Sequence, residues 1–71
     1  MKIQTIEDFA IYESDGHGKT TKGNKKSSGI QVRQYIHDGY LLLATYSYPI
    51  GDNIKRNAAI EKARNYIKES I

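Results

Sequence analysis

The sequence predicts an α+β fold in which a three-stranded antiparallel sheet packs against one C-terminal α-helix (βββα). Three observations carry this prediction. An Asp-Gly pair divides two strand-like runs within residues 30–48, large apolar side chains alternate at positions 9 and 11, and the residues after Pro49 place apolar side chains at helical spacing. At 71 residues, the chain is expected to form one domain, residues 1–71, with a thin core and no deep catalytic cleft.

The first expected strand covers residues 9–13, and a shorter extended piece precedes it around residues 2–5. The apolar residues change phase between Ile6 and Phe9. A β-bulge near residues 6–8 would make one continuous strand of this segment, whereas a helical turn capped by Thr5 is the competing interpretation. Because an isolated hairpin is marginally stable in water, this strand is expected to complete the sheet.

Residues 14–29 are expected to form a long flexible basic loop between strands 1 and 2. The segment contains no apolar residue, and it holds four glycines and four lysines. It is too polar to offset the entropy of ordering it. Its GHGKTT stretch differs from a phosphate-binding P-loop, because Glu13 stands where the first glycine is required and no helical pattern follows.

Residues 30–48 are expected to form a hairpin whose two loop residues are Asp38 and Gly39. This turn would pair His37 with Tyr40 and would separate the side chains onto two faces. The face expected to be buried contains Ile30, Val32, Gln34, Ile36, Leu41, Leu43 and Thr45. The other face is aromatic and contains Gln31, Arg33, Tyr35, His37, Tyr40, Leu42, Ala44 and Tyr46. Either the strand propensity of tyrosine or a recognition surface explains this second face.

The C-terminal segment is expected to form an amphipathic helix after the break at Pro49 and Gly51. Its apolar side contains Ala59, Ile60, Ala63, Tyr66, Ile67 and Ile71. A start at Asn57 suits this pattern, since a start at Asp52 or Asn53 would bring Arg56 into the apolar stripe. Both starts offer an acceptable N-cap residue and stay open.

This expected architecture resembles the DNA-binding domains of the AP2 and integrase arm-binding class. Residues 30–71 carry the resemblance, through the GYLLLATY strand and the AAIEKARNYI helix. It is a resemblance of architecture, without a diagnostic motif, and it implies a sheet that contacts DNA.

The sequence does not predict an enzyme, a cofactor or a metal site. It has no cysteine nucleophile and no serine in a recognisable nucleophile elbow. Its two histidines, His17 and His37, lack metal-ligand spacing. The acidic residues Glu7, Asp8 and Glu13 fit a solvated strand edge better than a tuned catalytic pair.

Basic residues with interleaved aromatic residues predict a small protein that binds nucleic acid. The lysines of the loop would neutralise phosphates, and an Arg/Tyr sheet face would stack on bases or enter a groove. The residues expected to bind nucleic acid are Lys19, Lys22, Lys25, Lys26, Arg33, Tyr35 and Tyr46. The alternative is a protein-interaction module, such as a small inhibitor or accessory subunit from a mobile element, which binds a protein partner through the same tyrosines or a strand edge.

The expected protein is cytoplasmic and is a monomer or a homodimer. No segment approaches the roughly 20 apolar residues that span a bilayer, and no signal-peptide pattern is present at the N-terminus, so no membrane partner is expected. The absence of cysteine fits a reducing compartment.

Overall fold

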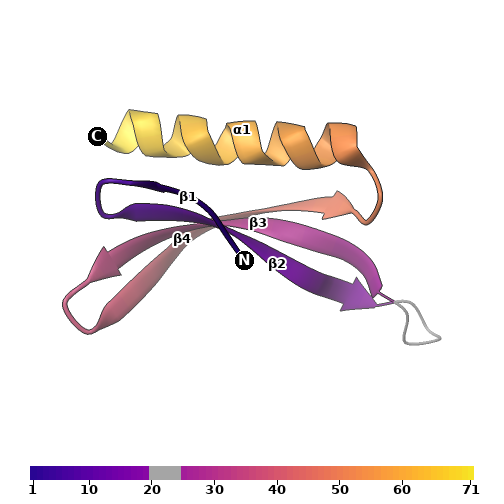
Figure 1. Cartoon of the computed structure of the whole chain (residues 1–71), viewed down its shortest axis with the longest axis horizontal. Coiled ribbons are helices and arrows are strands. Elements are labelled where there is room, and N and C mark those ends of the chain that lie inside the picture. The colour runs from indigo at the N-terminus through magenta and orange to yellow at the C-terminus, as the bar shows by residue number, and fades with distance from the viewer. Residues whose placement is uncertain (20–24) are drawn as a thin grey trace.

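A computed structural model of the chain describes the backbone of residues 1–19 and 25–71 and the side chains of residues 1–14 and 27–71. The described strands are β1 (Lys2–Ile6), β2 (Phe9–Lys19), β3 (Lys25–Ile36) and β4 (Gly39–Pro49), and the helix is α1 (Asn53–Ser70). The strands form one antiparallel sheet in the order β1-β2-β3-β4. Helix α1 lies across one face of this twisted sheet, and no described element covers the other face (Figure 1).

The α+β architecture with an antiparallel sheet against one C-terminal helix is confirmed, but the sheet has four strands instead of three. The phase change after Ile6 is neither a bulge nor a helical turn. It is a reversal at Glu7 and Asp8 that folds β1 back onto β2. Glu7 adopts a positive φ of 54°, a conformation that is uncommon for residues other than glycine. The sequence carries no signal for this turn, because it places a glutamate where a positive φ normally indicates glycine.

The prediction of a loop over residues 14–29 is wrong at both of its ends. β2 continues to Lys19 and β3 begins at Lys25, with Ser14 paired to Gly29 and Lys19 paired to Lys25. A hairpin satisfies its backbone N–H and C=O groups without needing any apolar side chain, so a polar composition does not exclude strands. Residues 20–24 lie outside the described residues.

The β3–β4 hairpin turns one residue earlier than predicted. His37 and Asp38 form the turn, and Gly39 begins β4. Gly39 has a φ of 152°, a backbone conformation that residues other than glycine rarely adopt. Tyr35 therefore pairs with Tyr40, and the predicted pairing of His37 with Tyr40 is wrong.

The register then shifts once more within the hairpin. Val32 pairs with Ala44 while Arg33 pairs with Leu42, which leaves Leu43 as the extra residue of a β-bulge. Because faces alternate residue by residue, this shift transfers every residue from Ala44 onward to the opposite face from the one predicted. Ala44 and Tyr46 lie on the helix side, and Thr45, which was expected to be buried, lies on the other face.

The core lies between α1 and the sheet face that it covers. It contains Phe9, Ile11, Ile30, Val32 and Tyr48 from the strands and Ala59, Ile60, Ala63 and Ile67 from the helix. Ile36 and Leu41 were expected to be buried here, but both side chains are 49% exposed. They lie at the tip of the β3–β4 hairpin, which extends away from α1 (Figure 1).

Helix α1 begins at the earlier of the two expected positions. Asp52 is the N-cap residue, and its carboxylate accepts a hydrogen bond of 3.0 Å from the backbone N–H of Lys55. The start at Asn57 is therefore wrong. The earlier start was expected to bring Arg56 into the apolar stripe of the helix, and Arg56 does lie toward the sheet, where it contacts Glu13. The side chain of Ile54 is 84% exposed.

Candidate nucleic-acid interface

The sheet face away from α1, called the open face below, is defined by strand pairing. Partners in an antiparallel ladder point to the same side, and Ile11, Ile30 and Val32 mark the side that faces the helix. The open face therefore collects residues of alternate parity from every strand. Its members among the residues whose side chains are described are Lys2, Thr5, Ala10, Tyr12, Ser14, Ser27, Gly29, Gln31, Arg33, Tyr35, Tyr40, Leu42, Thr45, Ser47 and Pro49.

The open face carries positive charge without an opposing acid among the residues whose side chains are described. Lys2 and Arg33 supply two cations. Glu13, the acidic residue nearest to them in β2, pairs with Ile30 and therefore lies on the helix side. Among these residues, Lys2 and Arg33 therefore give the open face a positive charge.

The guanidinium of Arg33 packs on two tyrosine rings on the open face, and a third tyrosine contacts both of these tyrosines. The guanidinium carbon lies 4.0 Å from the ring centroid of Tyr12 and 4.3 Å from that of Tyr40. Tyr35 meets Tyr40 edge to face, with ring centroids 6.1 Å apart, and its hydroxyl is 2.8 Å from the hydroxyl of Tyr12. These contacts combine cation–π attraction with aromatic packing. We call this group the tyrosine cluster: Tyr12, Arg33, Tyr35 and Tyr40.

The hydrogen bond between two phenols affects the acidity of the cluster. The contact with the Tyr12 hydroxyl raises the pKa of Tyr35 above its ordinary value of 10.0, with a further contribution from desolvation. The Tyr35 hydroxyl therefore stays protonated at neutral pH.

Arg33 is partly engaged by its neighbours on the open face. Its Nε and one terminal nitrogen donate to Oε1 of Gln31, at 3.1 and 2.8 Å, while Tyr12 and Tyr40 lie over the guanidinium. These two contacts use two of its five N–H donors. The large apolar and aromatic side chains that this face exposes are Tyr35, Tyr40 and Leu42.

The structure brings together two of the seven residues predicted from the sequence to bind nucleic acid. Arg33 and Tyr35 are neighbours within the tyrosine cluster. Tyr46 is not part of it, because it pairs with Ile30 and packs against the core on the helix side. The side chains of the other four residues, Lys19, Lys22, Lys25 and Lys26, lie outside the described residues.

The site list from sequence missed Tyr12 and Tyr40. Tyr40 was expected on the same face as Arg33 and Tyr35, so its inclusion needed only the correct pairing with Tyr35. For Tyr12 the signal was its position one residue after Ile11, which places it on the face opposite a core side chain. Its closeness to Arg33 depended on the β2–β3 register, which no local motif specifies.

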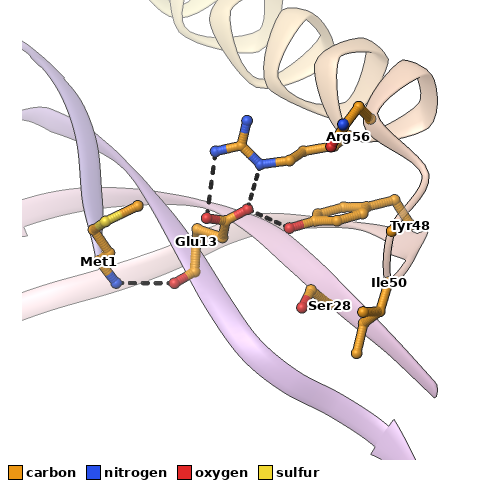
Figure 2. Close-up of a pocket in the computed structure, with 8 residues that line it drawn as sticks. Met1, Glu13, Ser28, Tyr48, Ile50 and Arg56 are labelled. Carbon is orange, nitrogen blue, oxygen red and sulfur yellow. Dashed lines mark hydrogen bonds and ion pairs between the residues drawn. The ribbon is translucent and has the colours of Figure 1, made fainter. Parts of the chain in front are cut away.

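A second group of polar side chains lines a pocket of about 440 Å³ at the N-terminal end of α1. The Glu13 carboxylate lies at its centre (Figure 2). Nε of Arg56 donates to Glu13 Oε2 at 2.6 Å and a terminal nitrogen donates to Oε1 at 3.3 Å, while the Tyr48 hydroxyl also donates to Oε2. Three elements, β2, β4 and α1, therefore meet at one carboxylate.

These contacts shift all three acid–base equilibria in the pocket. Hydrogen bonds from Arg56 and Tyr48 lower the pKa of Glu13 below its ordinary value of 4.5. Burial, together with the Glu13 carboxylate, raises the pKa of Tyr48, and the hydrogen bond to Glu13 raises that of Arg56. The expectation of a solvated edge for Glu13 is wrong, since its side chain is only 17% exposed. The carboxylate is fully engaged within the fold, so this group holds the helix to the sheet.

Other candidate features add no further site. The His37 imidazole lies 3.7 Å from the Asp38 carboxylate, and both side chains are almost fully exposed in the turn. No cluster of three or more metal-ligating side chains occurs among the described residues. Within the same residues, no helix has the length and apolar character to cross a membrane.

Comparison with known proteins identifies no relative. No protein-family model, curated protein or solved structure matches the chain. Evidence about function therefore comes from the residues of the open face.

Proposed function

We propose that this protein binds single-stranded nucleic acid, with unpaired bases on the open face and backbone phosphates on the lysines of the β2–β3 hairpin. One observation carries the proposal: an arginine packs on two tyrosine rings that a third tyrosine contacts, on a sheet face with no acidic residue among those whose side chains are described. Base–aromatic stacking tolerates any base sequence and contributes roughly 1–3 kcal/mol per base.

The choice of unpaired bases follows from what the tyrosine cluster offers. Arg33 already donates two hydrogen bonds to Gln31 and packs on two tyrosine rings, so what the cluster exposes most is the ring surface of Tyr35 and Tyr40. In a duplex, both faces of each base are already stacked on neighbouring bases. A single strand leaves those faces available to Tyr35 and Tyr40.

The phosphate contacts in this proposal come from the hairpin that extends from the open face. Lys19 and Lys25 pair directly across β2 and β3, and Lys22 and Lys26 belong to the same segment. β3 runs without interruption from Lys25 to Tyr35, so one strand connects the lysines with the tyrosine cluster. A nucleic acid strand that follows β3 would meet phosphate-binding residues first and stacking residues next.

Fluorescence anisotropy tests the proposal with labelled single-stranded DNA and RNA and with a duplex of equal length. We expect single strands to bind more tightly than the duplex. If the four hairpin lysines contact phosphates, log K should fall with log salt at a slope of about −3. Replacement of these four lysines by alanine should remove most of that slope.

Variants at Tyr40 separate stacking from charge. Tyr40→Ala removes an exposed ring, so we expect affinity to fall by a factor of about 5–100, the equivalent of one lost stacking contact. Tyr40→Phe is the matched control, because it keeps the ring and should bind like the wild type. Equal binding by Tyr40→Ala, or no binding to any nucleic acid at low salt, would contradict the proposal.

The exposed apolar area beside the cluster favours a second candidate function, recognition of a protein. Tyr40 and Leu42 are both exposed, and aromatic residues are enriched where proteins bind one another. This candidate predicts that Tyr40→Ala abolishes capture of the partner while the four lysine substitutions have no effect. The lysine variant therefore discriminates between the two functions.

A further inference from the structure

The two edges of the sheet differ in how well they are protected from another strand. β1 forms one edge with five residues, and its register with β2 is irregular after Lys2. β4 forms the other edge with 11 residues. No charged residue occurs anywhere from Gly39 to Gly51, although the chain as a whole has a net charge of +3. Charged side chains on edge strands are a common defence against strand pairing, and β4 lacks them.

Exposed apolar side chains concentrate at one end of this unprotected edge. The described residues contain nine large hydrophobic side chains that are exposed, and five of them lie in the short stretch between Tyr35 and Leu42. They occupy both faces of the hairpin tip: Ile36 and Leu41 on the helix side, and Tyr35, Tyr40 and Leu42 on the open face. Beyond Tyr35 the hairpin has no β2 neighbour, since β2 begins at Phe9, which pairs with Gln34.

From these features we infer that two copies of the chain form a homodimer by antiparallel pairing of their β4 edges at the hairpin tip. The free backbone groups of a strand edge form a template for pairing with another strand, and a second β4 brings an edge that is equally long, apolar and uncharged. The basic segments of the two copies lie elsewhere in the sequence, so like charges do not meet at the contact.

The bulge at Leu43, the two-fold symmetry and the apolar side chains together select the register of the pair. The regular part of β4 before the bulge is Gly39 to Leu42. Paired residues must share a face, so a two-fold pair centred in this part places either Tyr40 or Leu41 opposite its own copy. The register centred on Leu41 brings more apolar area together, because it places Tyr40 opposite Leu42 of the second copy, whereas the other register places Gly39 opposite Leu41. This arrangement pairs apolar side chains on both faces of the joined sheet.

Such a dimer closes on itself and extends the open face. The contact uses the β4 edge of both copies, so only the short β1 edges remain at the ends of an eight-stranded sheet. A two-fold axis perpendicular to the sheet places both open faces on the same side. The two tyrosine clusters then lie on one continuous surface. The dimer does not depend on the proposed nucleic-acid function, and each can fail without the other.

Cysteine cross-linking tests the register, because the natural chain contains no cysteine. In Leu41→Cys the two thiols would lie opposite each other across the two-fold axis, at a separation that a disulfide can bridge. We expect rapid formation of a covalent dimer under mild oxidation. Ile54→Cys, at a position that is highly exposed on α1 and away from the proposed contact, is the control and should form little covalent dimer. Equal cross-linking of the two variants would overturn the proposed register.

Sedimentation equilibrium tests the dimer without any cross-link. The wild type should show a concentration-dependent mass between monomer and dimer. Leu41→Lys places like charges on the axis and should raise the dissociation constant by more than about tenfold. Ile54→Lys is the matched control and should dimerise like the wild type. A monomer at every concentration up to about 1 mM would overturn the inference, as would unchanged association of Leu41→Lys when circular dichroism shows that it is folded.

Discussion

At the scale of single residues, Glu13 and Arg56 are two charged side chains on the inner sides of β2 and α1, and each explains the presence of the other. Each interrupts an otherwise apolar pattern: Glu13 follows Phe9 and Ile11 on the buried side of β2, and Arg56 lies on the buried side of α1. They meet with the hydroxyl of Tyr48, so every strong donor or acceptor in the group has a partner. Removal of one partner from such a group leaves polar atoms poorly solvated and costs stability.

We expect Glu13→Gln to lower the free energy of unfolding by about 1–3 kcal/mol at neutral pH. The native fold holds the pKa of Glu13 below its ordinary value of 4.5, so the unfolded state binds more protons in that range. The stability that Glu13 contributes is complete above about pH 4.5 and is lost as pH falls through the lower native value. The gap between wild type and variant should therefore narrow in acid.

Urea denaturation at several pH values measures this gap. Glu61→Gln is a suitable control, because Glu61 forms an exposed ion pair of 3.4 Å with Arg64 and should change stability little. A gap between wild type and Glu13→Gln that stays constant from neutral to acidic pH would show that the carboxylate charge does not stabilise the fold.

At the scale of secondary-structure elements, the start of α1 shows how a local signal and a tertiary contact act together. Asp52 caps the helix at the position where Pro49 and Gly51 end the preceding strand. The price of this early start is an exposed Ile54 and an arginine on the inner side. Glu13 compensates for the charge of the arginine, and the four residues from Asn53 to Arg56 add a helical turn that brings Arg56 against Glu13.

Asp52→Ala should destabilise the protein by about 1 kcal/mol, because the backbone N–H of Lys55 loses its acceptor. The first turn of α1 should also exchange its amide hydrogens faster. Asp52→Asn keeps a side-chain oxygen at the cap and should recover most of the loss. Thermal unfolding of the three proteins checks this order, and equal stability of the alanine and asparagine variants would contradict the capping role.

At the scale of the whole molecule, the helix covers only the central part of the sheet, and both long hairpins extend past it (Figure 1). The side chains with no measurable exposure, among them Ile11, Ile30 and Ile67, lie where α1 crosses β2 and β3. The β3–β4 tip has apolar side chains but no covering element among the described residues. Stability should therefore fall steadily from the centre toward this tip.

Hydrogen exchange in dilute solution should reveal this gradient. Amides of Ile11 and Val32 are expected to exchange last, near the rate of global unfolding, and amides from Ile36 to Leu41 early. If the chain dimerises as inferred, protection of Leu41 should rise with protein concentration while that of Ile11 stays the same. Uniform protection along β3 would contradict the gradient.

Much of the fold follows from the sequence alone. The Asp-Gly pair, the break at Pro49 and the spacing of Ala59, Ala63 and Ile67 specify a hairpin followed by an amphipathic helix, because turn chemistry and periodicity act over a few residues. The same local rules marked Arg33 and Tyr35 as neighbours on an aromatic face. They missed β1 as a separate strand, since Glu7 and Asp8 carry no turn signal strong enough to show a reversal.

Only the tertiary structure decided which residues share the candidate site. A shift of one residue in register moves a side chain to the other face, so the bulge at Leu43 removed Tyr46 from the open face. The β2–β3 register brought Tyr12 to Arg33, and Glu13 found Arg56 at a distance of 43 residues along the chain. Local sequence patterns cannot encode these contacts, because their energies arise only after separate elements have packed together.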